Sequence, residues 1–422
     1  MPKTEIFFSN KNDLFLAWFV VGCGIVGAIN LAKLAPSMGR IIDYFQIALS
    51  TSGLIAGIFS VLMITTGLIG GIIVSKYGPR LAMLLGLFIS ALGGVFPVLI
   101  PNLNTLMFGR TLEGFGFLLI NLSAPVLLSL HTNKSNRGKV MGVWGSFMPA
   151  GNALIILIAP FVYLFSDWQL LWEVSVYFAA GMCFLAYFII PLDPEQFKTP
   201  LKEKLSLVIM NIIKKRSIII VGATFACHSL IFLGNMQFLP YYFNEIAGYS
   251  ENFSYLATAC YCLISFVGHL YCGILLGLEH NPIKLISLAF VAAGVFVAFF
   301  FGVFDAFITF DRLSIIKLLA IMLAAFFMGL TPPTIFYLVS YVSPPSRITP
   351  INYGYMVQIQ AIGIFAGSYL YGWLVDETGG WKVIGFLGIF ISILGIIGGI
   401  ISARIILGNK KCSLKVIKLI SK

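Results

Sequence analysis

The chain is divided into twelve long apolar runs, and this pattern restricts its possible folds more than any other feature. Each run is at least 20 residues long, at about 14 to 37, 47 to 74, 81 to 100, 104 to 130, 139 to 165, 170 to 190, 217 to 243, 252 to 278, 283 to 304, 313 to 342, 350 to 375 and 382 to 407. A helix needs about 20 residues to cross the roughly 30 Å hydrocarbon core of a bilayer. Since 59% of the 422 residues are hydrophobic and 10% are charged, the sequence predicts an all-α polytopic membrane protein with twelve transmembrane helices.

The basic residues between the runs predict the orientation of the chain. If both termini are cytoplasmic, 21 Lys and Arg residues lie in inner loops and tails, and only Arg40, Arg312, Lys317 and Lys382 lie on the outer side. Basic residues collect in short cytoplasmic loops. We therefore expect a multi-pass protein of the cell (inner or plasma) membrane with both termini in the cytoplasm. The net charge of +11 follows from this topology, and we expect no nucleic-acid partner.

One long polar connector divides the chain into two similar halves. We expect an N-terminal six-helix bundle at 1–190, a cytoplasmic linker at 191–216, and a C-terminal six-helix bundle with a basic tail at 217–422. Aligning Pro36 with Pro240 sets Lys33 against Gln237, and Trp168 before the sixth run matches Trp381 before the twelfth. Internal repeats of this kind are typical of transporters, so we expect two pseudo-symmetric bundles.

The stretch from Gly71 to Leu81 predicts a tight, basic hairpin between the second and third helices. Gly78 permits a positive φ and Pro79 cannot continue a helix. Gly71, Lys76, Gly78 and Arg80 match the loop signature of the major facilitator superfamily, and the whole chain resembles a transporter of that family. The resemblance implies the two-bundle fold of the family and a loop that clasps neighbouring helix ends at the inner gate. Ser75 replaces the usual acid, so the charge latch of the family is in question; a generic basic hairpin is the alternative.

The fourth run contains two charges inside an apolar segment. Its sequence G-R-T-L-E-G-F-G resembles a second motif of the family, with Arg110, Gly114 and Gly116 in place and Glu113 where Gln is common. An intramembrane charge costs about 2.5 to 3.5 kcal/mol at the bilayer centre. Because Arg110 and Glu113 are three residues apart on one helix face, they can offset each other, and the two glycines let another backbone approach closely.

The first run places Asn30 and Lys33 one turn apart, shortly before Pro36. A basic residue that precedes a proline on the first helix resembles the cyanate permease and related anion-transporter branch of the superfamily. Lys33 and Arg110 both lie in the outer third of their helices. Each therefore either faces a cavity or extends to the lipid headgroups, as long basic side chains commonly do.

The family resemblance implies that the first, fourth, seventh and tenth helices line a central cavity. The candidate substrate-binding residues are Lys33, Arg110, Gln237, Asn30 and Asn235. Two fixed cations in a low-dielectric funnel attract a small anion. Glu113 is the candidate proton-coupling residue, with His228 and His269 as alternatives, although a membrane histidine also commonly bonds to a neighbouring helix. Gln358 and Gln360 are two residues apart, so at most one of them faces inward.

These observations predict a secondary active transporter that moves a small organic or inorganic anion by alternating access, with proton coupling. A proton-coupled exporter of drugs or amphipathic metabolites is the alternative, and a non-transporting receptor or enzyme is a third. We expect no metal, because the seven cysteines lack ligand spacing. We also expect no catalytic residues and no cofactor, since the sequence has no nucleotide-binding G-x-x-x-x-G-K-[ST] motif and no clustered catalytic set. The expected partners are a small anionic substrate, protons and the lipid bilayer, and the expected state is a monomer.

Overall fold

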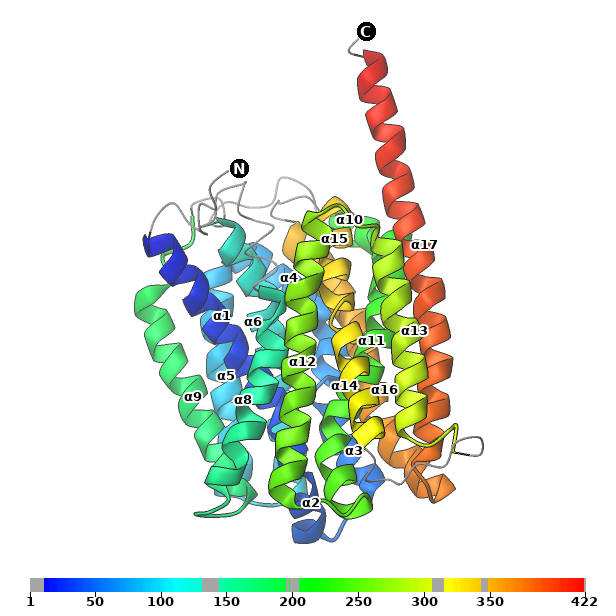
Figure 1. Cartoon of the computed structure of the whole chain (residues 1–422). Coiled ribbons are helices and arrows are strands. Elements are labelled where there is room, and N and C mark those ends of the chain that lie inside the picture. Colours follow the sequence, from blue (N-terminus) through cyan, green and yellow to red (C-terminus); the bar gives the residue numbers. More distant parts are fainter. Residues whose placement is uncertain are drawn as a thin grey trace.

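The computed structural model describes residues 11–130, 144–194, 197, 205–305, 315–342 and 348–420, and all of its regular elements are helices. Most of the helices run roughly parallel, and the first described helix begins at the end of the bundle where the last one leaves it (Figure 1). We call this end the inner end and the opposite end the outer end, after the orientation that the sequence predicts. Because the described chain begins and finishes at one end, it crosses the bundle an even number of times.

The N-terminal half holds the first six spans. Its helices are α1 (Lys11–Ala32), α2 (Leu34–Phe45), α3 (Leu49–Ile58), α4 (Val61–Tyr77), α5 (Pro79–Leu99), α6 (Leu103–Leu130), α8 (Phe147–Val162) and α9 (Trp168–Ile189). The C-terminal half follows the short helix α10 (Leu205–Ile213). Its helices are α11 (Arg216–Tyr241), the π-helical turn η2 (Tyr242–Ile246), α12 (Glu251–Gly277), α13 (Pro282–Phe300), α14 (Ile315–Met328), α15 (Thr331–Val342), α16 (Thr349–Thr378) and α17 (Lys382–Ile420).

The structure confirms the twelve-span architecture. Ten helical stretches of the described chain are long and apolar enough to cross a bilayer. The 16-residue apolar helix α8 and the 30-residue helix α16 account for the fifth and eleventh spans. The beginning of the expected fifth span, at 139–143, lies outside the described residues.

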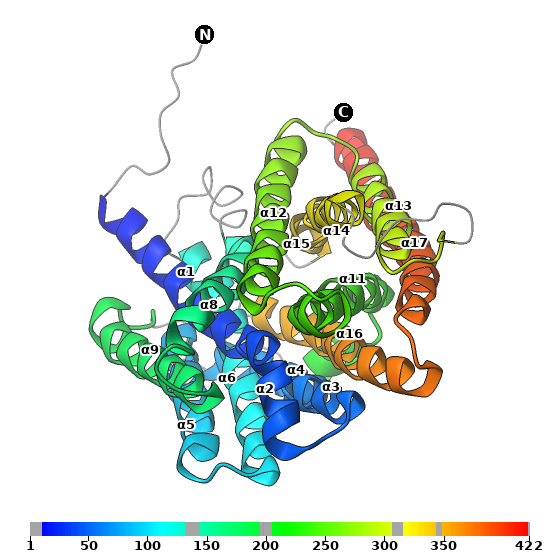
Figure 2. The same cartoon turned by 60° about the horizontal axis from the view of Figure 1, so that its bottom comes forward.

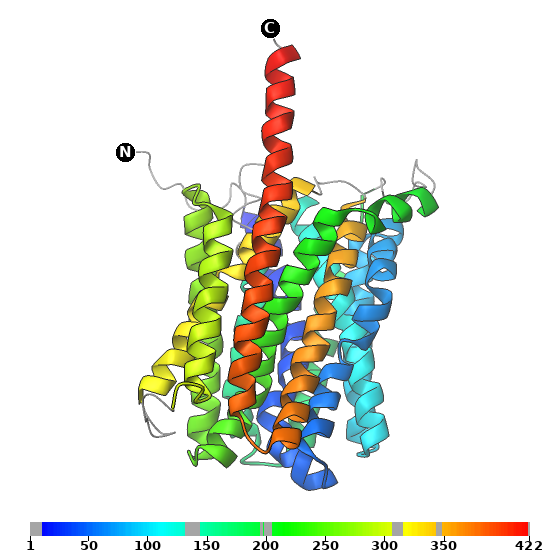
Figure 3. The ribbon, with the colours of Figure 1, turned by 90° about the vertical axis from the view of Figure 1, so that its right-hand side faces the viewer.

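Several spans are interrupted or longer than the sequence predicts. The first span breaks at Lys33 and then continues to Phe45, beyond the expected end at residue 37. The second breaks between Ile58 and Val61, and the tenth breaks before Thr331, where the Thr-Pro-Pro sequence predicts a kink. In the expected linker, α10 buries Val208 and Ile212 and packs against α16. The basic tail continues α17 to Ile420, so this helix extends beyond the bundle (Figure 3).

The two halves pack side by side along several helices (Figure 2). α16 lies against α3 and α4, α12 lies against α8, and α11 lies against α2. Glycines bring the backbones together: a Cβ at Gly71 would lie 2.5 Å from the carbonyl oxygen of Pro350, and one at Gly53 would lie 2.5 Å from that of Ser368. Small residues permit such close helix contacts in membranes, so the halves touch near both ends.

Candidate functional site: a buried charge triad and two cavities

Lys33, Arg110 and Glu113 form a connected ion network inside the N-terminal half. Lys33 Nζ lies 2.6 Å from Glu113 Oε1, and Arg110 Nη1 lies 3.0 Å from Glu113 Oε2. None of the three side chains has exposed surface. The pairing of Arg110 with Glu113, expected from their spacing on one helix face, is confirmed. We call these three residues the charge triad.

Neighbouring polar groups provide further hydrogen bonds to the two cations. Lys33 Nζ donates to Asn30 Oδ1 at 3.1 Å and to Ser175 Oγ at 2.6 Å. Arg110 donates to the carbonyl oxygens of Asn30 and Leu31, the latter at 3.1 Å. These carbonyls are at the end of α1, where helix carbonyls lack the usual partner. The break at Lys33 therefore supplies acceptors that a continuous helix would already use.

Aromatic rings enclose the charge triad. Lys33 Nζ lies 4.7 Å from the centre of the Trp172 ring, and Arg110 Cζ lies 4.6 Å from that of Phe59. Phe59 comes this close because α6 has a glycine at 114, where a Cβ would overlap the Phe59 carbonyl oxygen. The expectation that Gly114 permits close backbone approach is confirmed. Neither cation extends to the lipid headgroups in this structure, since both are fully enclosed by protein.

Asn30, Asn235 and Gln237, the other candidate substrate ligands, are also buried. Asn30 Nδ2 donates to the carbonyl oxygen of Val26 at 3.2 Å. Asn235 Oδ1 accepts from Tyr371 Oη at 3.2 Å within the C-terminal half. Gln237 Nε2 donates to the carbonyl oxygen of Leu31 at 3.3 Å, so it crosses from the C-terminal half to the end of α1. Asn30 and Gln237 therefore adjoin the charge triad, whereas Asn235 bonds within its own half.

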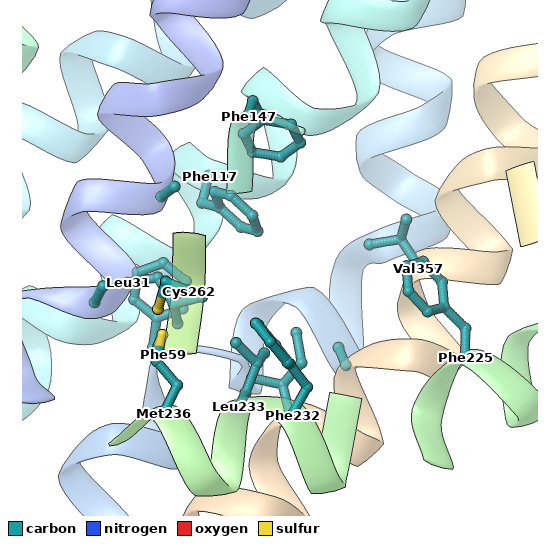
Figure 4. Packing of buried hydrophobic residues seen from close by; sticks show 14 of the residues in the cluster. Leu31, Phe59, Phe117, Phe147, Phe225, Phe232, Leu233, Met236, Cys262 and Val357 are labelled. Carbon is teal, nitrogen blue, oxygen red and sulfur yellow. The ribbon is translucent and has the colours of Figure 1, made fainter. Parts of the chain in front are cut away.

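A small central cavity of about 40 Å³ lies between the two halves. His228, His269 and Gln360 line it together with Asn121 from α6. Its remaining wall is largely apolar and includes Phe147, Met148, Phe225, Phe232, Leu233 and Phe336. Figure 4 shows Phe147 and Phe117 from the N-terminal half and Phe225, Phe232 and Leu233 on α11. Gln358 instead accepts from the Leu68 N–H at 2.9 Å, so the expectation that at most one of the two glutamines faces inward is confirmed.

A larger outer cavity of about 280 Å³ is lined by α2, α11, η2 and α12. Its polar wall includes Arg40, Asp43, Glu245 and Glu251. Arg40 also connects the halves, with Nη2 at 2.9 Å from Glu251 and Nη1 at 3.4 Å from Asp167. Neither of these two cavities is lined by Lys33, Arg110 or Gln237, although the outer cavity reaches Ala35 and Pro36 at the start of α2, directly after Lys33.

The basic hairpin has the tight turn that the sequence predicts, and an acid that is distant in the sequence binds to it. α4 ends at Tyr77, α5 begins at Pro79, and Gly78 between them has φ +93°. The carboxylate of Asp193, after α9, accepts from the Arg80 N–H at 3.0 Å. Asp193 therefore caps the start of α5, where backbone N–H groups lack helical partners.

The other two signature residues lie on α4. Gly71 contacts α16 across the halves. Lys76, in the last turn of α4, is exposed and lies 5.0 Å from the centre of the Tyr77 ring. The signature loop thus joins the two helices of the hairpin and adjoins the opposite half.

Several residues that complete these sites were not predicted from the sequence. Ser175 and Trp172 contact Lys33 from α9, but nothing in the local sequence of either residue connects it with the first span. Arg40 stood out only as one of few basic residues on the outer side. The signal for Asp193 was Ser75, which replaces the acid of the signature and so indicates that another acid binds the hairpin. Among the described residues no group of three His, Cys, Asp or Glu side chains could hold a metal.

The chain is similar in sequence or fold to known membrane transporters. The family model described as Major Facilitator Superfamily matches residues 15–368. The uncharacterized MFS-type transporter YhcA of Bacillus subtilis (strain 168) is 21% identical over 190 residues, which are 44% of this chain and 36% of that relative. Two solved structures at 15% identity share the fold: the MFS transporter FucP in the outward conformation and a variant of the E. coli fucose:proton symporter FucP. Each has a TM-score of 0.67 and covers 93% of this chain and 99% of its own.

Proposed function

Because the chain belongs to the major facilitator superfamily, we propose that it is a secondary active transporter that moves a small anion together with a proton. The observation that carries this proposal is the position of Glu113 between Lys33 and Arg110, at 2.6 and 3.0 Å. Glu113 is the only fully buried acid among the residues whose burial is described. Two buried cations are a binding site for an anion, and a buried carboxylate between them is a site for a proton.

Charge balance supports the coupling of the two ions. With all three side chains ionised, the charge triad carries one net positive charge. An anion that binds Lys33 and Arg110 releases Glu113, and a proton on the released carboxylate keeps the total charge unchanged. Unbalanced charge inside a membrane protein is costly. The empty and the loaded forms would therefore change conformation at similar cost, whereas a form loaded with only one of the two ions would not.

The outer cavity supports access of the anion from the outer end. It reaches Ala35 and Pro36, two and three residues after Lys33, and it contains Arg40. In this structure the charge triad has no exposed surface. The described conformation is therefore closed between the outer cavity and the charge triad, and opening along α2 would connect them.

Export of an amphipathic metabolite is a second candidate function. The observation that favours it is the central cavity, whose wall combines aromatic rings with the neutral polar groups of Asn121 and Gln360. Such a wall suits a solute with an apolar body and few polar groups. In that case His228 and His269, which line the cavity, are alternative proton carriers to Glu113.

Uptake into proteoliposomes tests both functions. Labelled carboxylates and amphipathic amines are compared with and without a pH gradient. For anion–proton symport we expect Lys33→Ala and Arg110→Ala to abolish carboxylate uptake, and Glu113→Gln to abolish accumulation driven by the pH gradient while exchange of internal and external solute continues. The control is Lys317→Ala, since this lysine is also buried in a span but pairs with Asp305 in the C-terminal half.

The outcomes separate the candidates. Normal carboxylate uptake by both cation variants would exclude the anion proposal. If His228→Asn or His269→Asn lost pH-driven transport while Glu113→Gln kept it, proton coupling would be assigned to the central cavity. Transport of amines only, blocked by Phe232→Ala, would favour the exporter.

A further inference from the structure

The carbonyl oxygen of Leu31 joins the two halves next to the charge triad. It accepts from Arg110 Nη2 at 3.1 Å and from Gln237 Nε2 at 3.3 Å. Arg110 belongs to the N-terminal half and Gln237 to the C-terminal half, and neither has exposed surface. Figure 4 shows Leu31 on α1 and Met236, the residue before Gln237, on α11. One acceptor, with two lone pairs, therefore binds a donor from each half.

Two buried atoms beside this carbonyl lack a hydrogen-bond partner among the described residues. They are the acceptor Gln237 Oε1 and the donor Arg110 Nε. An unsatisfied buried polar atom is costly, and these two are of complementary type. A second arrangement, in which Arg110 leaves the carbonyl and donates to Gln237 Oε1, would satisfy both atoms. In this structure the first pattern is formed, with both donors on the Leu31 carbonyl oxygen.

From this geometry we infer that Gln237 is a positioning residue that couples the ionisation of the charge triad to the opening of the halves at the outer end. The inference rests on the proposed role of Glu113 as the proton site. While Glu113 is ionised, it holds Arg110 on Leu31, and the carbonyl also holds Gln237, so the halves stay closed. When Glu113 is protonated, it no longer holds Arg110 in place. Arg110 then donates to Gln237 Oε1 and its long side chain moves with Gln237, which leaves the Leu31 carbonyl, so α11 separates from the end of α1.

A cysteine in the outer cavity measures this opening without any transport assay. Ser254→Cys is nearly isosteric, and Ser254 is fully buried in the wall of the outer cavity. In a background without the native cysteines, its rate of labelling by an impermeant thiol reagent reports opening. We expect Glu113→Gln to raise this rate about fivefold or more, the usual size of coupling between sites. We expect Gln237→Leu to raise the labelling rate as well. In the Gln237→Leu variant, adding Glu113→Gln should not raise the labelling rate further.

The matched control is Gln358→Leu. Gln358 also forms a hydrogen bond between the halves, from the Leu68 N–H at 2.9 Å, but it does not contact the charge triad. In this control the response to Glu113→Gln should persist. If Gln237→Leu does not fold, Gln237→Met keeps the length of the side chain without its hydrogen bond.

Two results would overturn the inference. In the first, Glu113→Gln raises the labelling rate of Ser254→Cys as much in the Gln237 variants as in the chain with Gln237. In the second, Glu113→Gln fails to raise the labelling rate in Gln358→Leu as well. The proposed function fails on a different result, namely pH-driven uptake that persists in Glu113→Gln. Since labelling and uptake are measured separately, failure of the inference is distinguished from failure of the proposed function.

Discussion

The two halves of the molecule bury polar groups of different kinds. The N-terminal half contains the charge triad, with one acid between two cations at 2.6 and 3.0 Å. In the C-terminal half, buried side chains form neutral pairs: Tyr371 donates to Asn235 at 3.2 Å, and Gln360 donates to Ser229 at 3.0 Å. The buried Lys317 of this half pairs with an acid that is 41% exposed, Asp305. The pseudo-symmetric bundles thus share a helical arrangement but differ in where they place ionisable groups.

This difference suggests a division of roles. An ion network changes its energy strongly when one member gains or loses a proton, because its charges interact in a medium of low dielectric constant. Neutral hydrogen bonds respond only to changes in geometry. The aligned positions Lys33 and Gln237 show the contrast directly, since both are fully buried, one belongs to the charge triad, and the other bonds to Leu31 beside it. We therefore expect the ionisation of the charge triad to change in the N-terminal half, and the C-terminal half to move in response to that change.

The largest expected effect comes from removing the acid of the charge triad. Glu113→Leu leaves Lys33 and Arg110 buried without their counter-ion, and breaking a buried ion pair costs about 3 to 5 kcal/mol. Gln360→Leu removes only the neutral bond to Ser229, worth about 0.5 to 1.5 kcal/mol. In thermal unfolding of the purified protein, we expect the midpoint of Glu113→Leu to fall well below that of Gln360→Leu. Equal midpoints for the two variants would contradict the proposed difference between the halves.

Close packing, unlike charge, should matter equally in both halves. A Cβ at Gly114 would overlap the carbonyl oxygen of Phe59, and one at Gly363 would overlap that of Ala226 on α11. Overpacking of this kind costs about 1 to 3 kcal/mol. We expect Gly114→Ala and Gly363→Ala to lower the unfolding midpoint by similar amounts, with Gly181→Ala, which meets open space, as the control. A large drop in only one half would show that the halves also differ in packing.

The sequence was sufficient to predict most of the fold. Apolar length predicted the spans, and Gly78 with Pro79 predicted the first inner hairpin, because each feature acts locally on the backbone. The breaks at Lys33 and near Phe59 were not predicted, since both segments read as continuous apolar runs. They depend on tertiary contacts: Arg110 binds the carbonyls freed at the first break, and Gly114 makes room for the second.

The candidate site was predicted in its composition but not in its arrangement. Spacing alone paired Arg110 with Glu113, because residues three apart on a helix are neighbours. Nothing in the sequence could show that Lys33, 80 residues before Glu113, lies 2.6 Å from it, or that Ser175 completes its hydrogen bonding. A charged residue inside a span indicates a partner, but identifying that partner requires the packing of four separate helices.

A smaller effect is expected at the loops that join the second span to the third and the eighth to the ninth. In the N-terminal half a distant acid, Asp193, accepts from the Arg80 N–H at 3.0 Å; in the C-terminal half Asn281 caps its own helix through the Ile283 N–H at 2.9 Å. Loss of a helix cap costs about 0.5 to 2 kcal/mol. We expect Asp193→Ala to speed amide hydrogen exchange at the start of α5, and Asn281→Ala to do so at the start of α13. If Asp193→Ala left exchange at Arg80 unchanged, the distant cap would not stabilise this hairpin.

The smallest expected effect on stability is at Arg40. It distinguishes contacts between the halves from contacts within one half. Arg40 pairs across the halves with Glu251 at 2.9 Å, whereas Lys317 pairs with Asp305 inside the C-terminal half, also at 2.9 Å. Since the Arg40 side chain is 31% exposed, the pair contributes about 0.2 to 1 kcal/mol. We expect Arg40→Ala to raise thiol labelling of Ser254→Cys by at most a few fold, and less in high salt because exposed charges are screened.

Lys317→Ala should leave that labelling unchanged, because its ion pair does not cross between the halves. Equal labelling in the two variants would mean that Arg40 does not hold the outer end closed. Closure there would then depend on other contacts between the halves. Among them is Tyr255 Oη, which lies 3.0 Å from the carbonyl oxygen of Pro36 and 2.6 Å from Glu251 Oε1. In that case Tyr255→Phe, rather than Arg40→Ala, should expose Ser254→Cys.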